Sequence, residues 1–210
     1  MSLDKFNTPQ EEFWAGDFGD EYIARNESPE LLSSNLAMFA KILATVDVLP
    51  VQVLEIGANV GRNIRALQQL LPGAKFTGVE INEAASERLA STGCTVVNAS
   101  IADVDLTNSY DLVFTKGVLI HIAPDLLKDT YKKMYSLSTR WILVAEYYNP
   151  SPVGIPYRGH TDRLFKRDFA GEMLELFPDL ILHDYGFAYH RGIYPQDDIT
   201  WFLLEKKTQK

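Results

Sequence analysis

Short apolar runs alternate with amphipathic segments through the middle of the chain. The apolar runs have the length of strands and occur at 51–56, 75–80, 95–97, 111–115 and 140–146. Between them, apolar residues repeat with the period of a helix over 61–71, 83–90 and 126–137. Apolar strands that alternate with helices are typical of a parallel sheet covered on both faces. We therefore predict an α/β fold built around such a sheet.

The N-terminal part departs from this alternation. Residues 29–46 have helical periodicity, with Ser28 as a candidate N-cap and Pro29 in the first turn. An aromatic and acidic segment, 13–22, precedes this helix. We expect its rings to cover another part of the molecule, because so many aromatic side chains are unfavourable in water.

The C-terminal part departs from the alternation in a different way. The stretch 147–156 is rich in Pro and Gly and predicts a loop, and 168–176 predicts a helix. The last two apolar runs, 180–189 and 199–205, are too close together for a crossover helix between them. We therefore predict that they pair as an antiparallel hairpin.

The composition narrows the class of protein. The 210 residues include 28 acidic and 20 basic ones, and the net charge of −8 argues against nucleic acid as a partner. No apolar run reaches the roughly 18 residues of a membrane-spanning helix, and the start of the chain lacks the apolar core of a signal peptide. Cys94 is the only cysteine, so no intrachain disulfide can form. We expect one cytoplasmic domain, monomeric or homodimeric, without a membrane partner.

A glycine-containing turn follows the first strand of the central region. It reads Glu55-Ile-Gly-Ala-Asn-Val-Gly61 and opens the helix 61–71, whose N-terminal N–H groups are available to a ligand. Gly57 permits a tight turn, and Gly61 permits close approach of the backbone to a ligand. Glu80 ends the second strand, 19 residues after Gly61, where a carboxylate can accept both hydroxyls of a ribose. The alternative is a simple turn with a solvent-exposed Glu80.

The spacing of the glycines separates two classes of nucleotide-binding enzyme. A dinucleotide site requires Gly-x-Gly-x-x-Gly, but Asn59 occupies the place of the second glycine here. The Glu-x-Gly-x-x-x-Gly turn instead resembles motif I of class I S-adenosylmethionine-dependent methyltransferases. This resemblance implies a seven-stranded, mostly parallel Rossmann-like sheet of order 3-2-1-4-5-7-6 with an antiparallel last strand. An NAD(P)-dependent oxidoreductase and a non-catalytic cofactor-binding module remain as alternatives.

The resemblance also implies which residues bind the cofactor S-adenosylmethionine and its product S-adenosylhomocysteine. In that family the turn holds the methionine part, the acid after the second strand binds the ribose, the stretch 98–103 lies against adenine, and the end of the fourth strand flanks the methionine part. The residues implied are Glu55, Gly57, Ala58, Asn59, Gly61, Glu80, Ile81, Ser100, Ile101, Thr115, Lys116 and Gly117.

A closer resemblance extends over almost the whole chain. The segments that carry it are 8–26, 145–150, 155–160, 162–169 and 196–205, and they look like the pseudaminic acid biosynthesis-associated methylases. This resemblance implies sugar modification at an oxygen or nitrogen. The acceptor would be a nonulosonic acid of the pseudaminic type, its nucleotide-linked form or an amino-sugar precursor.

On this basis we divide the single domain into four parts. Residues 1–46 would form an N-terminal helical cap or lid and 47–146 the cofactor-binding core. Residues 147–178 would supply the substrate loop and helix, and 179–210 the closing hairpin. Within the lid, Trp14, Tyr22 and Arg25 are candidates to reach the cofactor or close the site. The alternative for these side chains is packing on the domain surface alone.

A basic island interrupts the acidic chain at 156–167. It holds four basic residues and one acid, a net charge of +3, and it suits an anionic small molecule because Arg binds carboxylates and phosphates with paired hydrogen bonds. The alternative is a solvated face, or pairing with Asp168 and Glu172. The candidate substrate-binding residues are Tyr147, Tyr148, Asn149, Tyr157, Arg158, Arg163 and Lys166.

Two histidines are candidate general bases. His121 follows the fourth strand, and a parallel sheet presents residues there at its carboxyl edge. An imidazole at that place could remove a proton from an attacking hydroxyl or amine. His160 is the second candidate, and a structural role is the alternative for both. None of the four histidines has the spacing of a metal pair, so we predict no metal site.

Overall fold

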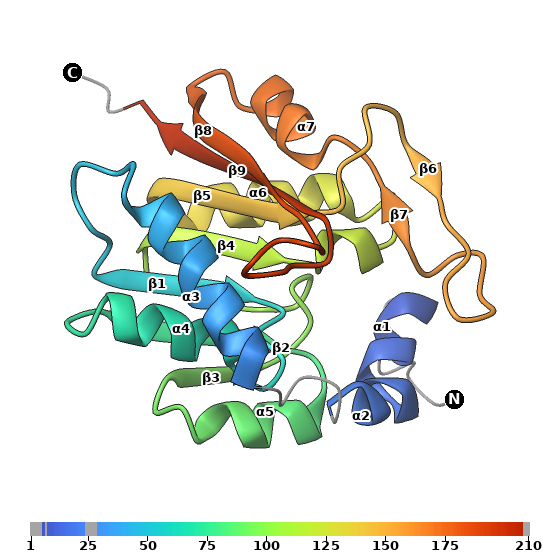
Figure 1. The fold of residues 1–210 in the computed structure, drawn as a ribbon. Helices are drawn as coiled ribbons and strands as arrows, with labels where there is room; N and C mark the ends of the chain where they lie inside the picture. Colours follow the sequence, from blue (N-terminus) through green and yellow to red (C-terminus); the bar gives the residue numbers. More distant parts are fainter. Residues whose placement is uncertain (1–5, 7, 24–28, 208–210) are drawn as a thin grey trace.

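The computed structural model describes residues 6, 8–23 and 29–207. Its centre is a seven-stranded sheet with the order β3-β2-β1-β4-β5-β9-β8 (Figure 1). The strands are β1 (Gln52–Ile56), β2 (Lys75–Glu80), β3 (Thr95–Asn98), β4 (Tyr110–Lys116), β5 (Ser138–Glu146), β8 (Leu180–Ala188) and β9 (Ile199–Lys206). β1 to β5 pair in parallel, whereas β9 is antiparallel to both β5 and β8. The predicted fold class, strand order and antiparallel last strand are confirmed.

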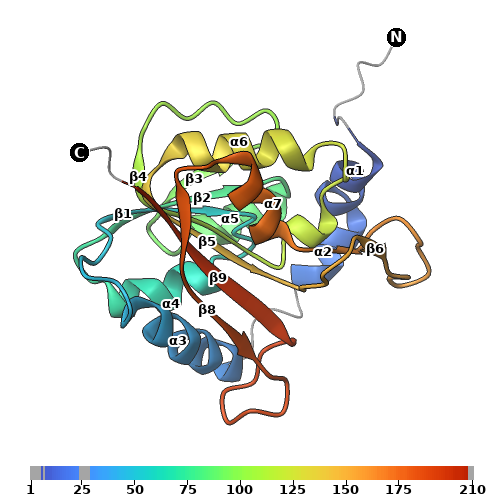
Figure 2. The same ribbon diagram turned by 90° about the horizontal axis from the view of Figure 1, so that it is seen from above.

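Helices cover both faces of this sheet, as Figure 2 shows from above. One face packs against α3 (Pro29–Leu43), α4 (Arg62–Leu70) and α5 (Glu83–Ala90), and the other against α6 (Leu127–Leu137) and α7 (Phe169–Leu176). Alternate residues of a strand point to opposite faces. In β4, Phe114 therefore joins the cluster under α3, and its neighbour Val113 joins the cluster under α6.

The parallel strands bring their carboxyl ends to one edge of the sheet. Ile56 at the end of β1 is in register with Val79 of β2 and with Thr115 of β4, and Lys116 is in register with Ala145 of β5. Residues that follow these strands therefore meet at the same edge, which is where open α/β sheets bind ligands.

Two short helices lie beyond this edge: α1 (Pro9–Ala15) and α2 (Asp17–Ile23) (Figure 1). Thr8 begins α1 because its hydroxyl oxygen accepts the N–H of Glu11 at 3.2 Å, and Pro9 fits the first turn. α3 lies elsewhere, since its Phe39 and Ile42 are buried against the sheet. The part of the predicted lid that lies near the carboxyl edge is therefore α1 and α2. Arg25 lies outside the described residues.

Two small elements complete the same end of the molecule. The predicted loop after β5 contains a two-stranded hairpin of β6 (Val153–Gly154) and β7 (Phe165–Lys166), and a turn of 3₁₀ helix, η2 (Leu119–His121), follows β4. Tight turns of this kind are frequent connectors between regular elements. Both lie beside the carboxyl edge and both carry candidate site residues.

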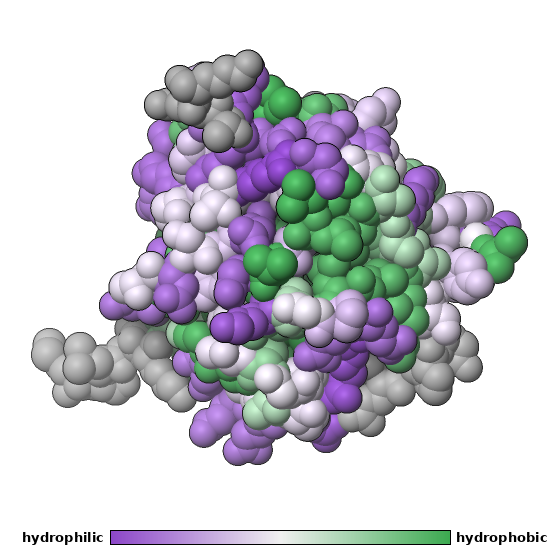
Figure 3. All heavy atoms as spheres, turned by 90° about the vertical axis from the view of Figure 1, so that its left-hand side faces the viewer, coloured by the Kyte–Doolittle hydropathy of each residue, from purple (hydrophilic) through white to green (hydrophobic). Residues whose placement is uncertain are grey.

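The surface away from this edge carries few functional signals. Figure 3 shows the side of the molecule that is on the left in Figure 1, and this side has an apolar area. Val48, Leu49 and Val51, which lie between α3 and β1, are exposed. No helix in the described part of the chain is long and apolar enough to cross a membrane.

Candidate active site

The turn after β1 is fixed by its backbone. Gly57 (φ 72°) and Asn59 (φ 47°) both have left-handed conformations, and the N–H groups of Gly57 and Ala58 donate to the carbonyl of Val79 at 2.9 and 3.0 Å. A side chain at Gly57 would place its Cβ 2.5 Å from Val118. The turn is therefore tight because Gly57 has no side chain, as predicted.

Gly61 has a packing role besides the one that we expected. A Cβ at this position would lie 2.6 Å from Thr92 and 2.7 Å from Leu89, both beside the start of α4 and away from the pocket. The left-handed backbone of Gly61 (φ 80°) and its missing side chain thus allow α4 to pack against α5. Close approach of the Gly61 backbone to a ligand stays a prediction.

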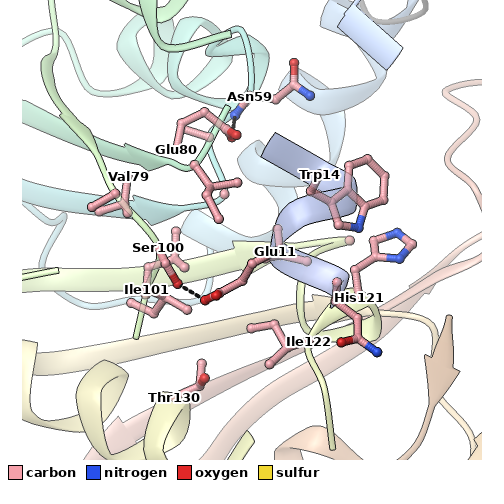
Figure 4. A pocket seen from close by; sticks show the side chains of 18 of the residues that line it. Glu11, Trp14, Asn59, Val79, Glu80, Ser100, Ile101, His121, Ile122 and Thr130 are labelled. Carbon is pink, nitrogen blue, oxygen red and sulfur yellow. Dashed lines mark hydrogen bonds between the residues drawn. The ribbon is translucent and has the colours of Figure 1, made fainter. Parts of the chain in front are cut away.

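Glu80 is a buried acid that holds the turn. Its Oε2 accepts the N–H of Asn59 at 2.7 Å and its Oε1 accepts the N–H of Asn82 at 2.8 Å (Figure 4). The side chain is only 7% exposed, and burial raises its pKa. The alternative of a solvent-exposed Glu80 is therefore wrong. Each carboxylate oxygen has a further lone pair, so Glu80 can still accept hydroxyls from the pocket.

Charged side chains gather where the turn meets β4. Glu55 is fully buried, accepts a hydrogen bond from the Asn63 amide at 2.6 Å, and has its pKa raised to about 8 by burial. Burial, together with the positive charge of Arg62, lowers the pKa of Lys116 to about 8. Arg62 and Lys116 both line the pocket. The two basic side chains at this wall favour an anionic group of the ligand.

The opposite end of the pocket has mostly apolar walls. Val79, Ile101 and Ile122 surround a pair of polar residues from distant parts of the chain, Ser100 and Glu11 (Figure 4). The Ser100 hydroxyl donates to Oε1 of Glu11 on α1 and also accepts the N–H of Ala102 at 3.1 Å. This end suits a flat ring system with a polar edge.

His121 lies where the pocket meets α1. Its Nδ1 is 2.7 Å from the carbonyl oxygen of Arg163, and its ring centroid is 4.5 Å from that of Trp14 and 5.4 Å from that of Tyr157 (Figure 4). A carbonyl oxygen only accepts, so Nδ1 carries the proton and Nε2 has the free lone pair. Burial lowers the pKa of His121 to about 4, so the ring is neutral at physiological pH.

Glu146, at the end of β5, positions the turn that carries His121. Its Oε1 accepts the N–H groups of Val118 and Leu119, each at 3.1 Å, and it is 2% exposed. Burial raises its pKa to about 7. Glu146 was not a predicted site residue, although it lies in the segment 145–150 that carries the closer resemblance and at the carboxyl edge of the sheet.

Most of the predicted cofactor residues meet in one pocket. Those that line it are Trp14, Tyr22, Gly57, Ala58, Asn59, Glu80, Ile81, Ser100, Ile101, Lys116 and Gly117. Glu55, Gly61 and Thr115 are buried behind it. Lining residues that the sequence reasoning missed include Glu11, Arg62 and Asn63. Thr8 and Pro9 are a start signal for the helix that carries Glu11, and Arg62 directly follows Gly61, so both residues had a local signal.

The predicted substrate residues lie outside that pocket. Tyr157 contacts the His121 ring, and exposed Arg158 lies with its guanidinium 5.6 Å from the Tyr157 ring. Arg163 pairs with Asp162 at 2.5 Å and lies 5.4 Å from the ring of Phe13 on α1.

The remaining candidates lie around the β6–β7 hairpin. Lys166 lies 5.0 Å from the ring of Tyr147, and exposed Tyr148 contacts Phe202 of β9. The side chain of Asn149 donates to the carbonyl of Ser151 at 2.5 Å. Exposed His160 contacts Phe13 at 5.1 Å between ring centroids and does not line the pocket.

The comparisons identify the class of protein that this fold and pocket define. Residues 54–139 match the sequence profile of a family described as "Methyltransferase domain". A search of curated proteins found no match. The profile match and the fold shared with methyltransferases that were crystallised with SAM or SAH support the predicted enzyme, a methyltransferase that uses S-adenosylmethionine as its cofactor.

Solved structures of similar fold come from several methyltransferases. The plantazolicin methyltransferase BpumL, in complex with a pentazolic desmethylPZN analog and SAH, has a TM-score of 0.67 at 13% identity, with 94% of this chain and 95% of that chain covered. Magnesium protoporphyrin IX methyltransferase from Synechocystis PCC 6803 with bound SAM has a TM-score of 0.64 at 15% identity (94% and 95% covered). The 1,6-didemethyltoxoflavin-N1-methyltransferase of Burkholderia thailandensis has a TM-score of 0.69 at 17% identity (94% and 87%). At these identities the likeness is one of fold.

Proposed function

We propose that this methyltransferase acts on an oxygen or nitrogen of a small anionic acceptor. The acceptor we favour is a nonulosonic acid of the pseudaminic type, its nucleotide-linked form or an amino-sugar precursor. The sequence resemblance over 8–26 and the segments after β5 supports this acceptor class. The similar structures name other acceptors, so the fold by itself does not select one.

The pocket suits the three chemical parts of the cofactor in order. Arg62 and Lys116 would hold the carboxylate of its amino-acid end, since both line the pocket beside the glycine turn. Glu80 would accept the ribose hydroxyls, because its carboxylate faces the same pocket between the two ends. Ile81 and Ile101 would pack against the purine. Bound there, S-adenosylmethionine supplies a methyl group on a positively charged sulfur.

The observation that carries the proposal is the fixed orientation of His121. Because Nδ1 donates to the Arg163 carbonyl, Nε2 is held unprotonated at the boundary between the pocket and α1. An acceptor hydroxyl at this boundary would give its proton to Nε2 while its oxygen bonds to the methyl carbon, and the methyl–sulfur bond would break so that S-adenosylhomocysteine leaves. Trp14 and Tyr157, in contact with the His121 ring, would help to exclude water.

The low pKa of His121 defines what kind of base it is. With a pKa of about 4, it is a weak proton acceptor that is always available at neutral pH. Its main contribution would be to orient the acceptor and to receive the proton late in the transfer. An amine acceptor with a near-neutral pKa would need this help less than a hydroxyl.

The basic island would bind the anionic group of the acceptor. Residues 156–167 lie next to the pocket, because Tyr157 and the Arg163 carbonyl both contact His121 in its wall. Gln10 of α1 also donates to the carbonyl of Asp162 at 3.0 Å. The guanidinium of Arg158 is exposed on this loop, close enough to Tyr157 to stack on its ring.

The test is transfer of labelled methyl from S-adenosylmethionine to each of the three acceptor types. We expect one of them to gain a single methyl, and Arg158→Ala to raise the KM for that acceptor about tenfold without changing the KM for the cofactor. Arg191→Ala, at an exposed arginine of the β8–β9 turn, is the matched control. Absence of any methylated product, or equal methylation of an acceptor whose carboxylate is blocked, would contradict the proposed acceptor class.

A further inference from the structure

The N-terminal helix α1 contributes a carboxylate to the apolar end of the cofactor pocket. Glu11 lines the pocket and accepts the Ser100 hydroxyl across 89 positions of the sequence (Figure 4). α1 brings it there because the Thr8 cap fixes the N–H of Glu11, and Gln10 fastens the helix to the carbonyl of Asp162.

The surroundings of Glu11 define the ligand group that fits beside it. Val79, Ile101 and Ile122 provide apolar contacts for the faces of a planar ring. The carboxylate of Glu11 offers hydrogen-bond acceptors at the edge of this space, and the Ser100 hydroxyl directs its proton to Glu11. The polar edge is therefore rich in acceptors, which selects a ring that carries donor N–H groups.

We propose that Glu11 is a specificity-determining residue that accepts a hydrogen bond from the exocyclic amine of the purine. This proposal rests on S-adenosylmethionine as the cofactor. The other two parts of the cofactor meet their complements elsewhere in the pocket, at Glu80 and at the Arg62–Lys116 pair, and the purine remains for the apolar end. A carboxylate strengthens such a bond because the acceptor is charged.

The assignment predicts discrimination between an amine and an oxo group. S-inosylhomocysteine differs from S-adenosylhomocysteine in having an oxo group where the amine stands. Its oxygen would face the Glu11 carboxylate, and two acceptors repel each other. A site built to accept a hydrogen bond rejects a ligand that lacks the donor.

The experiment measures the dissociation constants of both ligands by calorimetry. We expect the wild type to bind S-adenosylhomocysteine about 10–100-fold more tightly than S-inosylhomocysteine. In Glu11→Gln, the amide can donate to the oxo group. The variant should therefore bind S-adenosylhomocysteine about tenfold less tightly than the wild type does, and its preference for S-adenosylhomocysteine over S-inosylhomocysteine should shrink to about threefold or less. Glu12→Gln is the matched control, because Glu12 is the exposed neighbour on the same helix.

Ser100→Ala separates ligand recognition from simple attachment of the helix. It removes the hydroxyl that donates to Glu11 and leaves the carboxylate in place, so the preference for the amine should persist. If Glu11→Gln weakens both ligands equally, or neither, Glu11 only fastens α1 and the proposal is overturned. If the wild type binds neither ligand, the cofactor assignment fails and this proposal fails with it.

Discussion

His121 donates its Nδ1 proton to the backbone carbonyl of Arg163, 2.7 Å away and 42 positions later in the chain. This bond connects the turn after β4 with the basic loop before α7. It fixes the tautomer of the one histidine in the described pocket and leaves Nε2 as the nitrogen with a free lone pair.

We expect His121→Asn to lower kcat about 10²–10⁴-fold for a hydroxyl acceptor, because the variant removes the group that would orient the acceptor and receive its proton. Binding of S-adenosylhomocysteine should change little. Steady-state kinetics and calorimetry test these two expectations separately. His160→Asn should change kcat less than twofold, since His160 is exposed outside the pocket, and a large loss there would exchange the roles of the two histidines.

The buried neutral state of His121 also predicts how stability depends on pH. Its pKa is about 4 in the folded chain against 6.5 for an ordinary histidine, so the unfolded chain binds the proton first as pH falls. The contribution of His121 to the free energy of unfolding is fully present above pH 6.5. It is lost as pH falls towards 4, and the loss amounts to up to about 3 kcal/mol. Urea unfolding of wild type and His121→Asn across this range measures it. Parallel curves for the two proteins would mean that His121 does not resist protonation.

Glu80→Ala should weaken S-adenosylhomocysteine binding by about 1–3 kcal/mol if the carboxylate binds the ribose. Part of any loss could come from the turn, since Glu80 also holds the N–H of Asn59. Calorimetry with the 2′-deoxy form of the ligand separates the two effects. The deoxy ligand lacks one ribose hydroxyl, so Glu80→Ala should reduce its binding free energy by less. Glu83→Ala, at an exposed acid close by in α5, is the control. Equal losses for both ligands would assign Glu80 to the turn alone.

Arg62→Met and Lys116→Met should each reduce the preference for S-adenosylmethionine over its decarboxylated form by about tenfold or more. The decarboxylated ligand keeps the amine and lacks the carboxylate, so it loses the group that would pair with Arg62 and Lys116 and keeps a cation beside them. Competition binding measures this ratio. Arg65→Met is the control, because Arg65 is exposed on α4 and bonds to Ser91. An unchanged ratio in both variants would place the carboxylate elsewhere.

The strands and the helices that follow them could be predicted from local patterns. β1, β2 and β4 begin and end within about two residues of the predicted runs, because each is a buried apolar run bounded by Pro, Gly or polar residues. For α1 and α2 the sequence predicted a helical cap over 1–46 without separate bounds, because both helices are short and rich in aromatic residues. Tertiary packing stabilises such helices more than their own periodicity does.

The site could be predicted only in part, because some of its residues meet only through tertiary packing. Gly57, Asn59 and Glu80 follow adjacent strands of one parallel sheet, so their spacing in the chain already implied a shared pocket. The packing role of Gly61 could not be predicted because its neighbours, Leu89 and Thr92, belong to a separate helix and turn. Glu11 and Arg163 lie far from that spacing and reach the site through long-range contacts.

By itself, the sequence determined the alternation of strands and helices, the glycine turn with its acid, and the position of His121 after β4. Hydrophobic period, turn chemistry and capping act over a few residues and are visible in one dimension. Only the tertiary structure decided that Glu11 enters the pocket, that Arg163 sets the tautomer of His121, and that Arg62 and Lys116 share one wall. These contacts join segments that the chain order keeps apart, so burial and charge in three dimensions define them.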